Sequence, residues 1–318
     1  MPMEIPAGSA GAGETLNPSS EKIVLYNRRT GVLEEESVAG RAWMDFFYGT
    51  AVGRRITALL LCRPWLSRLY GAWQQHPASR GRIVPFARQF GVALQEARIP
   101  TGGFASFNDF FIRHLQAGAR PVAADPRALI APADSRLQVF DLTADTRLQV
   151  KGSAVTVPAL LGRPGLPQGF EGGCCLVFRL APCDYHRFGF VDDGLQGPIH
   201  NVPGLLHSVN PLSLKHKPDV HCTNQRQWCF LEGRALGTMI QVEVGAMLVG
   251  SIVQHQPAGG PCRRGGEKGY FQFGGSTVIL VLPPGRVVID AAIRHHSAKG
   301  IETLVRYGER IGEAVLAQ

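Results

Sequence analysis

The sequence lacks a hydrophobic run long enough to cross a membrane. The longest apolar run near the N-terminus, Ile56 to Cys62, is far shorter than the roughly 20 residues that a spanning helix requires. The first residues have neither the basic start nor the hydrophobic segment of a secretory signal peptide. We therefore expect residues 1–21 to form a disordered tail, and the protein to stay in the cytosol unless it binds a membrane surface.

Metal-binding and disulfide patterns are also missing. The seven cysteines are scattered and none forms a CxxC pair, so neither a zinc site nor a disulfide framework is indicated, and buried reduced thiols are expected. The glycine-rich segment 258–266 lacks the Lys-Ser/Thr ending of a phosphate-binding loop. The net charge of +8 favours acidic partners, but no basic patch interleaved with aromatic residues indicates nucleic acid. Anionic lipid is the acidic partner that remains.

Two regions of different character divide the chain. Residues 22–35 are typical of two short strands around a turn, and residues 40–118 have apolar side chains at helical spacing. Ser106 and Asp109 form a capping box that predicts a helix over 107–115. Beyond about residue 128, proline and glycine separate short strand-like runs, which predict strands at 137–140, 176–178, 240–244, 269–273, 278–282 and 287–290. We expect an α+β protein, with a mainly helical region (22–125) followed by a mostly antiparallel β sandwich or barrel-like core (126–318).

The segment from Arg54 to Trp73 combines leucines, aromatic residues and arginines. This combination suits a helix that lies in the surface of a membrane. It equally suits a core helix with a solvated basic edge, and the sequence leaves both interpretations open. On the first interpretation, the helical region 22–125 associates with a membrane.

Three polar motifs lie next to predicted strands. Asp134 precedes one strand, where it could orient a histidine or simply form a turn. His186 lies in a segment dense in ionisable groups, where it could act as an acid or base or as a structural hydrogen-bonding group. Ser276 follows Gly274-Gly275, which could permit a strained backbone for chemistry or only a hairpin turn. Each motif alone leaves both possibilities open.

Together these motifs resemble the phosphatidylserine decarboxylase family. The resemblance runs in the family's order from about residue 22 to 315. It rests on FNDFFIR (107–113), ARP (119–121), PAD (132–134), LAP (180–182), DYHRF (184–188), SVNP (208–211), VGA (244–246), VGSI (249–252), EKGYF (267–271) and GGST (274–277).

The resemblance implies a proenzyme that breaks its own chain between Gly275 and Ser276. The Ser276 hydroxyl attacks the Gly275 carbonyl to form an ester, and elimination and hydrolysis then leave a covalent pyruvoyl group on the new N-terminus. The products are a β chain (1–275) and an α chain (276–318), which stay together as partners. The pyruvoyl carbonyl forms a Schiff base with the substrate amine and accepts electrons as carbon dioxide leaves, so no metal or separate cofactor is implied.

The resemblance also implies site residues. Members of the family use a serine, an aspartate and the second histidine of DYHxxH for self-cleavage, and the first histidine for decarboxylation. Ser276, Asp134 and His186 match, but the position of the second histidine is Gly189. A general base contributes about 10²–10⁴-fold to a rate. The hypotheses are therefore that self-cleavage is slow, that His186 or another histidine such as His207 takes over as base, or that the protein never matures and only binds lipid.

The leading functional hypothesis is conversion of phosphatidylserine to phosphatidylethanolamine on an anionic membrane surface. This implies a peripheral protein on the cytoplasmic side of the cell membrane, and it leaves assembly as a homo-oligomer open. The alternatives are decarboxylation of a free amino acid or of another serine-headed lipid.

Overall fold

A computed structural model describes residues 22–36, 41–142, 147–150, 153–165, 167–247, 251–272 and 276–315. The expected disordered tail, residues 1–21, lies outside the described residues, as does Gly274-Gly275 of the third motif. The N-terminal hairpin and the helices that follow are β1 (Val24–Asn27), β2 (Val32–Glu35), α1 (Arg41–Gly49), α2 (Ala51–Ile56), a π-helical turn (Thr57–Leu61), α3 (Pro64–Gln75), a 3₁₀ segment (Pro77–Arg82), α4 (Ile83–Phe90), a 3₁₀ turn (Leu94–Glu96) and α5 (Phe107–Phe111).

The rest of the chain is mostly strands, as expected for an α+β protein. The strands are β3 (Ala128–Ile130), β4 (Ser135–Asp141), β5 (Arg147–Val150), β6 (Ser153–Thr156), β7 (Cys174–Leu180), β8 (Arg187–Gly189), β9 (Gly194–Gln196), β10 (His200–Val202), β11 (Arg226–Gly233), β12 (Gly237–Gly245), β13 (Ile252–Gln254), β14 (Gly260–Cys262), β15 (Glu267–Phe271), β16 (Ser276–Leu282), β17 (Val287–Ile289), β18 (Glu302–Val305) and β19 (Arg310–Ala314). The short helices between them are α6 (Val157–Leu161), α7 (Pro211–His216), α8 (Val220–Thr223) and α9 (Ala291–Ala298).

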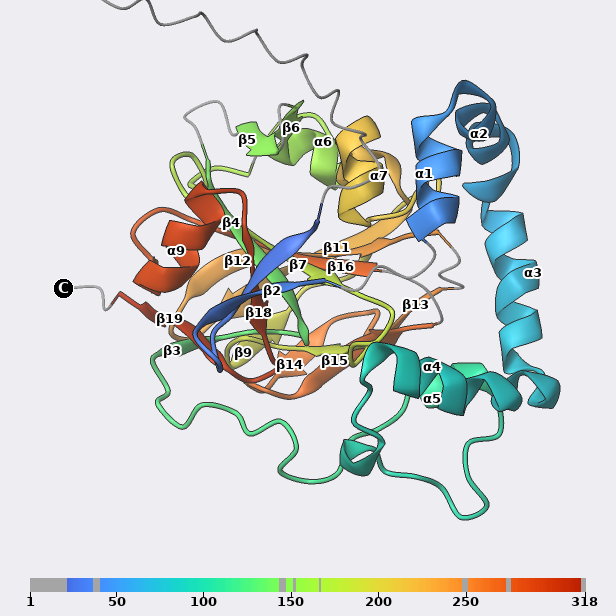
Figure 1. The fold of residues 1–318 in the computed structure, drawn as a ribbon. Coiled ribbons are helices and arrows are strands. Elements are labelled where there is room, and N and C mark those ends of the chain that lie inside the picture. The colour runs from blue at the N-terminus through green and yellow to red at the C-terminus, as the bar shows by residue number, and fades with distance from the viewer. Residues whose placement is uncertain are drawn as a thin grey trace, which may run out of the picture.

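One large sheet organises the molecule (Figure 1). It has 11 strands in the order β14-β9-β11-β12-β16-β7-β4-β18-β1-β2, with β10 paired to β11. Within the described residues β14 and β2 do not pair, so the sheet is open and is not a closed barrel. The ladders between its named strands are antiparallel except for β1 beside β18. Smaller sheets, β13-β15-β8 and β17-β19-β3, complete the core.

Strand β16 lies inside this sheet and is buried along its whole length. Successive side chains of a strand point to opposite faces. Accordingly, Val278, Leu280 and Leu282 join the larger hydrophobic cluster, while Ile279 and Val281 join the second one. Both faces of the sheet are therefore covered at β16. Ser276, in phase with Val278, faces the larger cluster.

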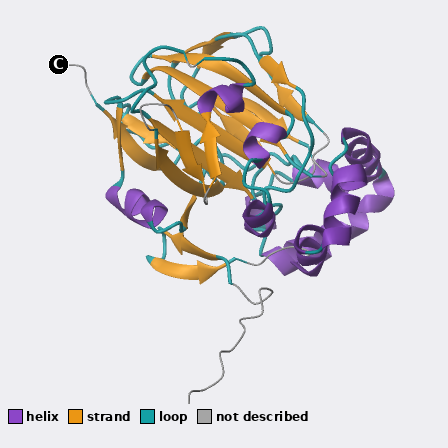
Figure 2. Ribbon diagram, turned by 90° about the horizontal axis from the view of Figure 1, so that it is seen from above, coloured by secondary structure: helices purple, strands orange, loops and turns teal. Residues whose placement is uncertain are grey.

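The helices from α1 to α5 gather at one side of the strand-rich part (Figure 2). The Ser106 hydroxyl accepts a hydrogen bond from the Asp109 N–H (3.1 Å) at the start of α5, as the capping box predicts. The predicted helix over 107–115 is too long, because α5 ends at Phe111 and Leu115 instead forms a β-bridge with Ala97.

Helices α2 and α3 are likewise separate, because Pro64 begins α3 where a continuous helix would need its N–H. Within the part of the chain that the structure describes, no helix has both the length and the apolar content to cross a bilayer.

Candidate functional site

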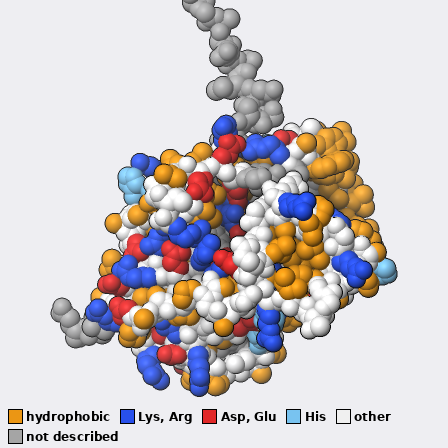
Figure 3. Space-filling view, turned by 60° about the horizontal axis from the view of Figure 1, so that its bottom comes forward, with side chains coloured by type: hydrophobic (Ala, Val, Ile, Leu, Met, Phe, Trp, Pro, Cys, Tyr) orange, Lys and Arg blue, Asp and Glu red, His pale blue; other side chains and the backbone are white. Residues whose placement is uncertain are grey.

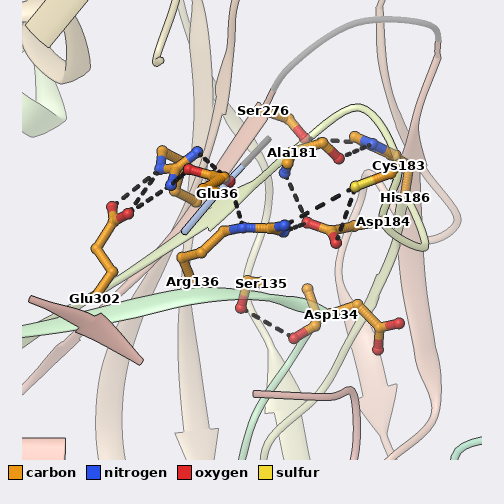
Figure 4. A network of polar contacts seen from close by, with 12 residues as sticks. Glu36, Asp134, Ser135, Arg136, Ala181, Cys183, Asp184, His186, Ser276 and Glu302 are labelled. Carbon is orange, nitrogen blue, oxygen red and sulfur yellow. Dashed lines mark hydrogen bonds and ion pairs between the residues drawn. The ribbon is translucent and has the colours of Figure 1, made fainter. Parts of the chain in front are cut away.

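Ser276 and His186 meet at the first residue of the central strand. Pairing of β16 with β7 places Ser276 opposite Leu180, and pairing with β12 places it opposite Gly245. The turn after β7 then brings His186 back over the strand, with its Nδ1 3.3 Å from Ser276 Oγ (Figure 4). Both residues are completely buried. The structure thus brings together two of the three site residues that the sequence predicts.

A second hydrogen bond fixes the state of the His186 ring. Its Nε2 lies 3.0 Å from the Ala181 carbonyl oxygen, which can only accept, so Nε2 carries the proton. Nδ1 is then the unprotonated nitrogen and accepts from the Ser276 hydroxyl. The ring also stacks on Phe111 at a centroid distance of 3.9 Å. Burial, reinforced by Arg113 and Arg136, lowers the pKa of His186 from 6.5 to about 3, so the ring is neutral at physiological pH.

The turn that carries His186 is held by a buried ion-pair network (Figure 4). Asp184 accepts a hydrogen bond from the Ala181 N–H (2.7 Å) and pairs with Arg136 on β4. Arg136 also pairs with Glu36 at 2.7 Å, and Glu36 pairs with Arg179 on β7. Burial raises the pKa of the Asp184 carboxyl, although Arg136 opposes this effect. The network joins the hairpin at 22–36, the sheet and the turn that carries His186.

Asp134 has other partners than the serine and histidine. Its carboxylate accepts hydrogen bonds from Arg120 Nε (2.8 Å) and Nη2 (2.6 Å), and from the Tyr307 backbone N–H (2.8 Å). In Figure 4 it lies below the Arg136–Asp184 pair and points away from Ser276. Within the described residues its hydrogen bonds therefore stabilise the loop before β4, and a neutral carbonyl orients His186 instead.

Gly189 has no room for a side chain. A Cβ built there would lie 2.0 Å from Tyr307 Oη and 2.6 Å from the Gly266 carbonyl oxygen. Tyr307 fills this space, and its hydroxyl donates to the Gly265 carbonyl at 3.1 Å. Glycine at 189 and tyrosine at 307 are thus matched in size, and a histidine at 189 cannot be added without moving Tyr307.

His207, the other histidine considered as a base, makes no hydrogen bond with Ser276 in the described part of the chain. The Asn224 side-chain amide joins the loop at His207 to the end of β12, because it donates to the carbonyls of His207 and Gly245 (2.8 Å each). The His207 ring packs edge-on to Tyr48. Burial lowers the pKa of His207 to about 4.

Several residues of the site were missed by sequence reasoning. Arg113 and Arg120 lie in motifs that carry the family resemblance, so a search for cations within those motifs could have found them. Tyr307 and Glu36 lie outside the quoted motifs and had no such signal. Across the described ranges, no group of three or more His, Cys, Asp or Glu side chains could hold a metal ion.

Comparison with known proteins gives matches over most of the chain. A family model described as phosphatidylserine decarboxylase matches residues 107–313. The phosphatidylserine decarboxylase proenzyme of Clostridium beijerinckii is 38% identical over 295 residues, covering 92% of this chain and 100% of the relative. That of Clostridium botulinum (strain Eklund 17B) is 40% identical with the same coverage. The proenzyme of Desulfitobacterium hafniense is 37% identical over 291 residues, covering 91% and 98%.

Proposed function

This chain belongs to the phosphatidylserine decarboxylase family, and from that premise we propose that it cuts itself between Gly275 and Ser276 and then converts phosphatidylserine to phosphatidylethanolamine and carbon dioxide. The contact between Ser276 Oγ and His186 Nδ1 at the start of the central strand carries the proposal. It gives the serine a proton acceptor at the point where the chain must break. Cleavage yields a β chain, 1–275, and an α chain, 276–318.

Self-cleavage begins when Ser276 Oγ attacks the Gly275 carbonyl carbon and its proton passes to His186 Nδ1. The C–N bond breaks, the imidazole returns the proton to the leaving amine, and an ester joins Gly275 to the Ser276 side chain. Loss of the α proton of residue 276 then expels the Gly275 carboxylate and leaves a dehydroalanine. Its hydrolysis releases ammonia and leaves a pyruvoyl group on the α chain.

His186 is the base in this scheme because the structure gives Ser276 no other acceptor among the described residues. Its ring is neutral, and the Ala181 carbonyl holds it in the required tautomer. The same burial disfavours the imidazolium that forms during attack. Self-cleavage is therefore expected to be slow.

The two chains remain associated because the cut falls inside a finished sheet. Strand β16 of the α chain has β12 on one side and β7 on the other, both from the β chain. Strand β18 similarly lies between β4 and β1. At least these four ladders would have to separate before the α chain could leave, and β16 is buried along its whole length.

Ser276 is a suitable precursor for the pyruvoyl group, since it begins a buried strand and already touches an imidazole. When present, the α-keto carbonyl binds the substrate amine and accepts the electron pair released with carbon dioxide. This chain's residues exclude water around position 276, and His186 is placed to move a proton there. The Arg136–Asp184 pair holds the turn that positions His186.

An apolar surface at the N-terminal helices supports a lipid substrate. Eight of the large hydrophobic side chains that are exposed in the described residues lie between residues 43 and 73, and we call them the apolar surface: Trp43, Phe46, Val52, Leu59, Leu60, Trp65, Leu69 and Trp73. Figure 3 shows hydrophobic side chains gathered at its upper right, at the end of the molecule occupied by α1 to α3. Arg54, Arg55, Arg63 and Arg68 lie in the same segment. Aromatic, leucine and arginine side chains together favour peripheral docking on the cytoplasmic face of an anionic membrane.

The test is the intact mass of freshly purified protein, followed by assay of carbon dioxide release. We expect two chains with a blocked α N-terminus, and activity on phosphatidylserine vesicles. Ser276→Ala should give one uncut, inactive chain. One uncut wild-type chain would favour the non-maturing alternative, and activity confined to free amino acids would overturn the lipid assignment.

Membrane docking is tested separately with Trp65→Ser plus Leu69→Ser. These changes should weaken binding to phosphatidylserine vesicles while self-cleavage continues. Val288→Ser is the matched control, because Val288 is equally exposed but lies on β17 in the strand-rich part. Equal vesicle binding by both variants would contradict docking through the apolar surface.

A further inference from the structure

A polar cavity lies beside the catalytic turn, and neither Ser276 nor His186 lines it. Its volume is about 210 Å³. The end of α4, the loop before β4 and the end of β18 form its walls, and four arginines line it: Arg29, Arg113, Arg120 and Arg306. Three carboxylates, those of Glu96, Asp134 and Asp184, also line it. The lining therefore carries one positive charge in excess, before the pairing of Asp184 with Arg136 behind the wall is counted.

The carboxylates of the cavity are already occupied. Arg120 donates to Asp134 at 2.6 Å and to Glu96 at 2.8 Å, and Arg306 lies 3.6 Å from Glu96. Asp184 is paired with Arg136. Against the effect of burial, the hydrogen bonds that Arg120 donates to Asp134 and Glu96 raise its pKa. These pairs stabilise the walls. Among the described residues, two arginines of the cavity, Arg113 and Arg29, have no carboxylate partner.

Arg113 is the more buried of the two remaining arginines, with 7% of its surface exposed. Its Nη atoms donate to the backbone carbonyls of Phe110, Cys183 and Asp184, and its Nε is buried with no hydrogen-bond partner in the described part of the chain. A buried polar group without a partner is costly in free energy. Burial accordingly lowers the pKa of Arg113. No carboxylate of the described residues forms an ion pair with Arg113.

Arg29 also lines the cavity and is exposed. No carboxylate of the described residues lies within ion-pair distance of its side chain, whereas neighbouring Arg28 pairs with both Asp290 and Glu309. Burial and Arg306 lower the pKa of Arg29. Among the described residues, two guanidinium groups without carboxylate partners thus share one cavity with Arg306, whose side chain lies 3.6 Å from Glu96.

We propose that this cavity binds a phosphate group. Guanidinium groups bind phosphate oxygens with charge-assisted, often bidentate hydrogen bonds. A phosphate carries between one and two negative charges near neutral pH, which matches the two arginines without carboxylate partners. The cavity has room for the group and several waters. The C-terminal end of α4 disfavours an anion, but its partial charge is smaller than that of one guanidinium.

The same chemistry is offered by free phosphate and by a phospholipid headgroup. The cavity does not include Ser276, so uncut Ser276→Ala protein provides the test, and the outcome does not depend on maturation. Binding is measured by titration calorimetry with inorganic phosphate and with glycerol phosphate, in chloride buffer of constant ionic strength. Vesicles of phosphatidylcholine with and without phosphatidic acid form a third arm, measured by co-sedimentation.

We expect Arg29→Gln and Arg306→Gln each to weaken phosphate binding about tenfold or more, the loss expected for a hydrogen bond to a charged group. Arg127→Gln is the matched control, because Arg127 is an exposed arginine paired with Asp125 outside the cavity, and it should bind as the parent does. Arg29-dependent binding of either soluble phosphate identifies a free ligand. Binding seen only with phosphatidic acid vesicles, and lost in Arg29→Gln, identifies a headgroup. No binding in any arm, or binding unchanged in both variants, overturns the proposal.

Discussion

The role of His186 as base makes a specific prediction about pH. In the folded protein its pKa is about 3, compared with an ordinary value of 6.5. A base is active in its unprotonated form, so the active fraction of His186 stays near one at any pH well above 3. An imidazole with the ordinary pKa would be mostly unprotonated at pH 7.5 but only about one-tenth unprotonated at pH 5.5. The rate of self-cleavage should therefore change by less than about twofold between pH 5.5 and 7.5, rather than about tenfold.

The assay follows conversion of freshly translated chain into its two fragments on denaturing gels, with samples transferred to buffers at pH 5.5, 6.5 and 7.5. His186→Ala should slow cleavage by about 10²–10⁴-fold, the usual contribution of a general base. His207→Ala is the matched control, because that buried imidazole also has a lowered pKa but makes no hydrogen bond with Ser276 among the described residues. Cleavage in His207→Ala should stay within about threefold of wild type.

Two results would refute this reasoning. A tenfold fall in the self-cleavage rate from pH 7.5 to 5.5 would identify a base with an ordinary imidazole pKa. His186 has a lowered pKa and would not give this fall. Undiminished cleavage in His186→Ala would show that Ser276 transfers its proton elsewhere.

Three further predictions concern stability and assembly. Gly189→Ala, made in uncut Ser276→Ala protein, should lower the free energy of unfolding in urea by about 1–3 kcal/mol, because the new Cβ meets Tyr307 Oη. Adding Tyr307→Leu should offset part of this loss. If the effects of the two substitutions on the free energy of unfolding simply add, the size match between the two positions is contradicted. The buried histidines 186 and 221 have pKa values lowered to about 3 and 4, so they stay neutral in the folded state while the unfolded chain binds protons below pH 6.5. Stability should therefore fall between pH 7 and 5 by about 1–2 kcal/mol for each, and His221→Gln should reduce that slope; a slope equal to that of the parent would contradict this. After cleavage, the α chain should co-purify with a tagged β chain in native buffer and separate only in denaturant; loss of α during native gel filtration would contradict the interleaved sheet.

Local patterns predicted the strands well, because the hydrophobic runs at 176–178, 240–244 and 278–282 belong to the buried centre of one sheet. They did not predict that β16 lies between β12 and β7, since the order of strands depends on contacts far apart in the chain. The helix predicted over 107–115 was too long for a similar reason. Leu115 forms a β-bridge with Ala97, and the spacing of apolar residues along a helix does not predict such a contact.

For the site, the motifs located Ser276 and His186 and left open whether they meet. The structure brings them together through β-ladder register and a turn. The partners of Asp134 could not be predicted, because Tyr307 lies 173 residues away in the chain. The packing of Tyr307 against Gly189 could not be predicted either, because these residues are also far apart in the sequence. Residue types showed that a histidine was missing there, but only packing showed what occupies its place.

The position of Ser276 inside a finished sheet has a consequence for quality control of the protein. An unfolded chain has no imidazole beside that hydroxyl, and so no means of making its own prosthetic group. In the proposed scheme, only a molecule that has already assembled β7, β12 and β16 around residue 276 can mature. The backbone cut would therefore occur only in correctly folded molecules. A misfolded copy would be inactive as a catalyst, because it never acquires the group that performs the chemistry.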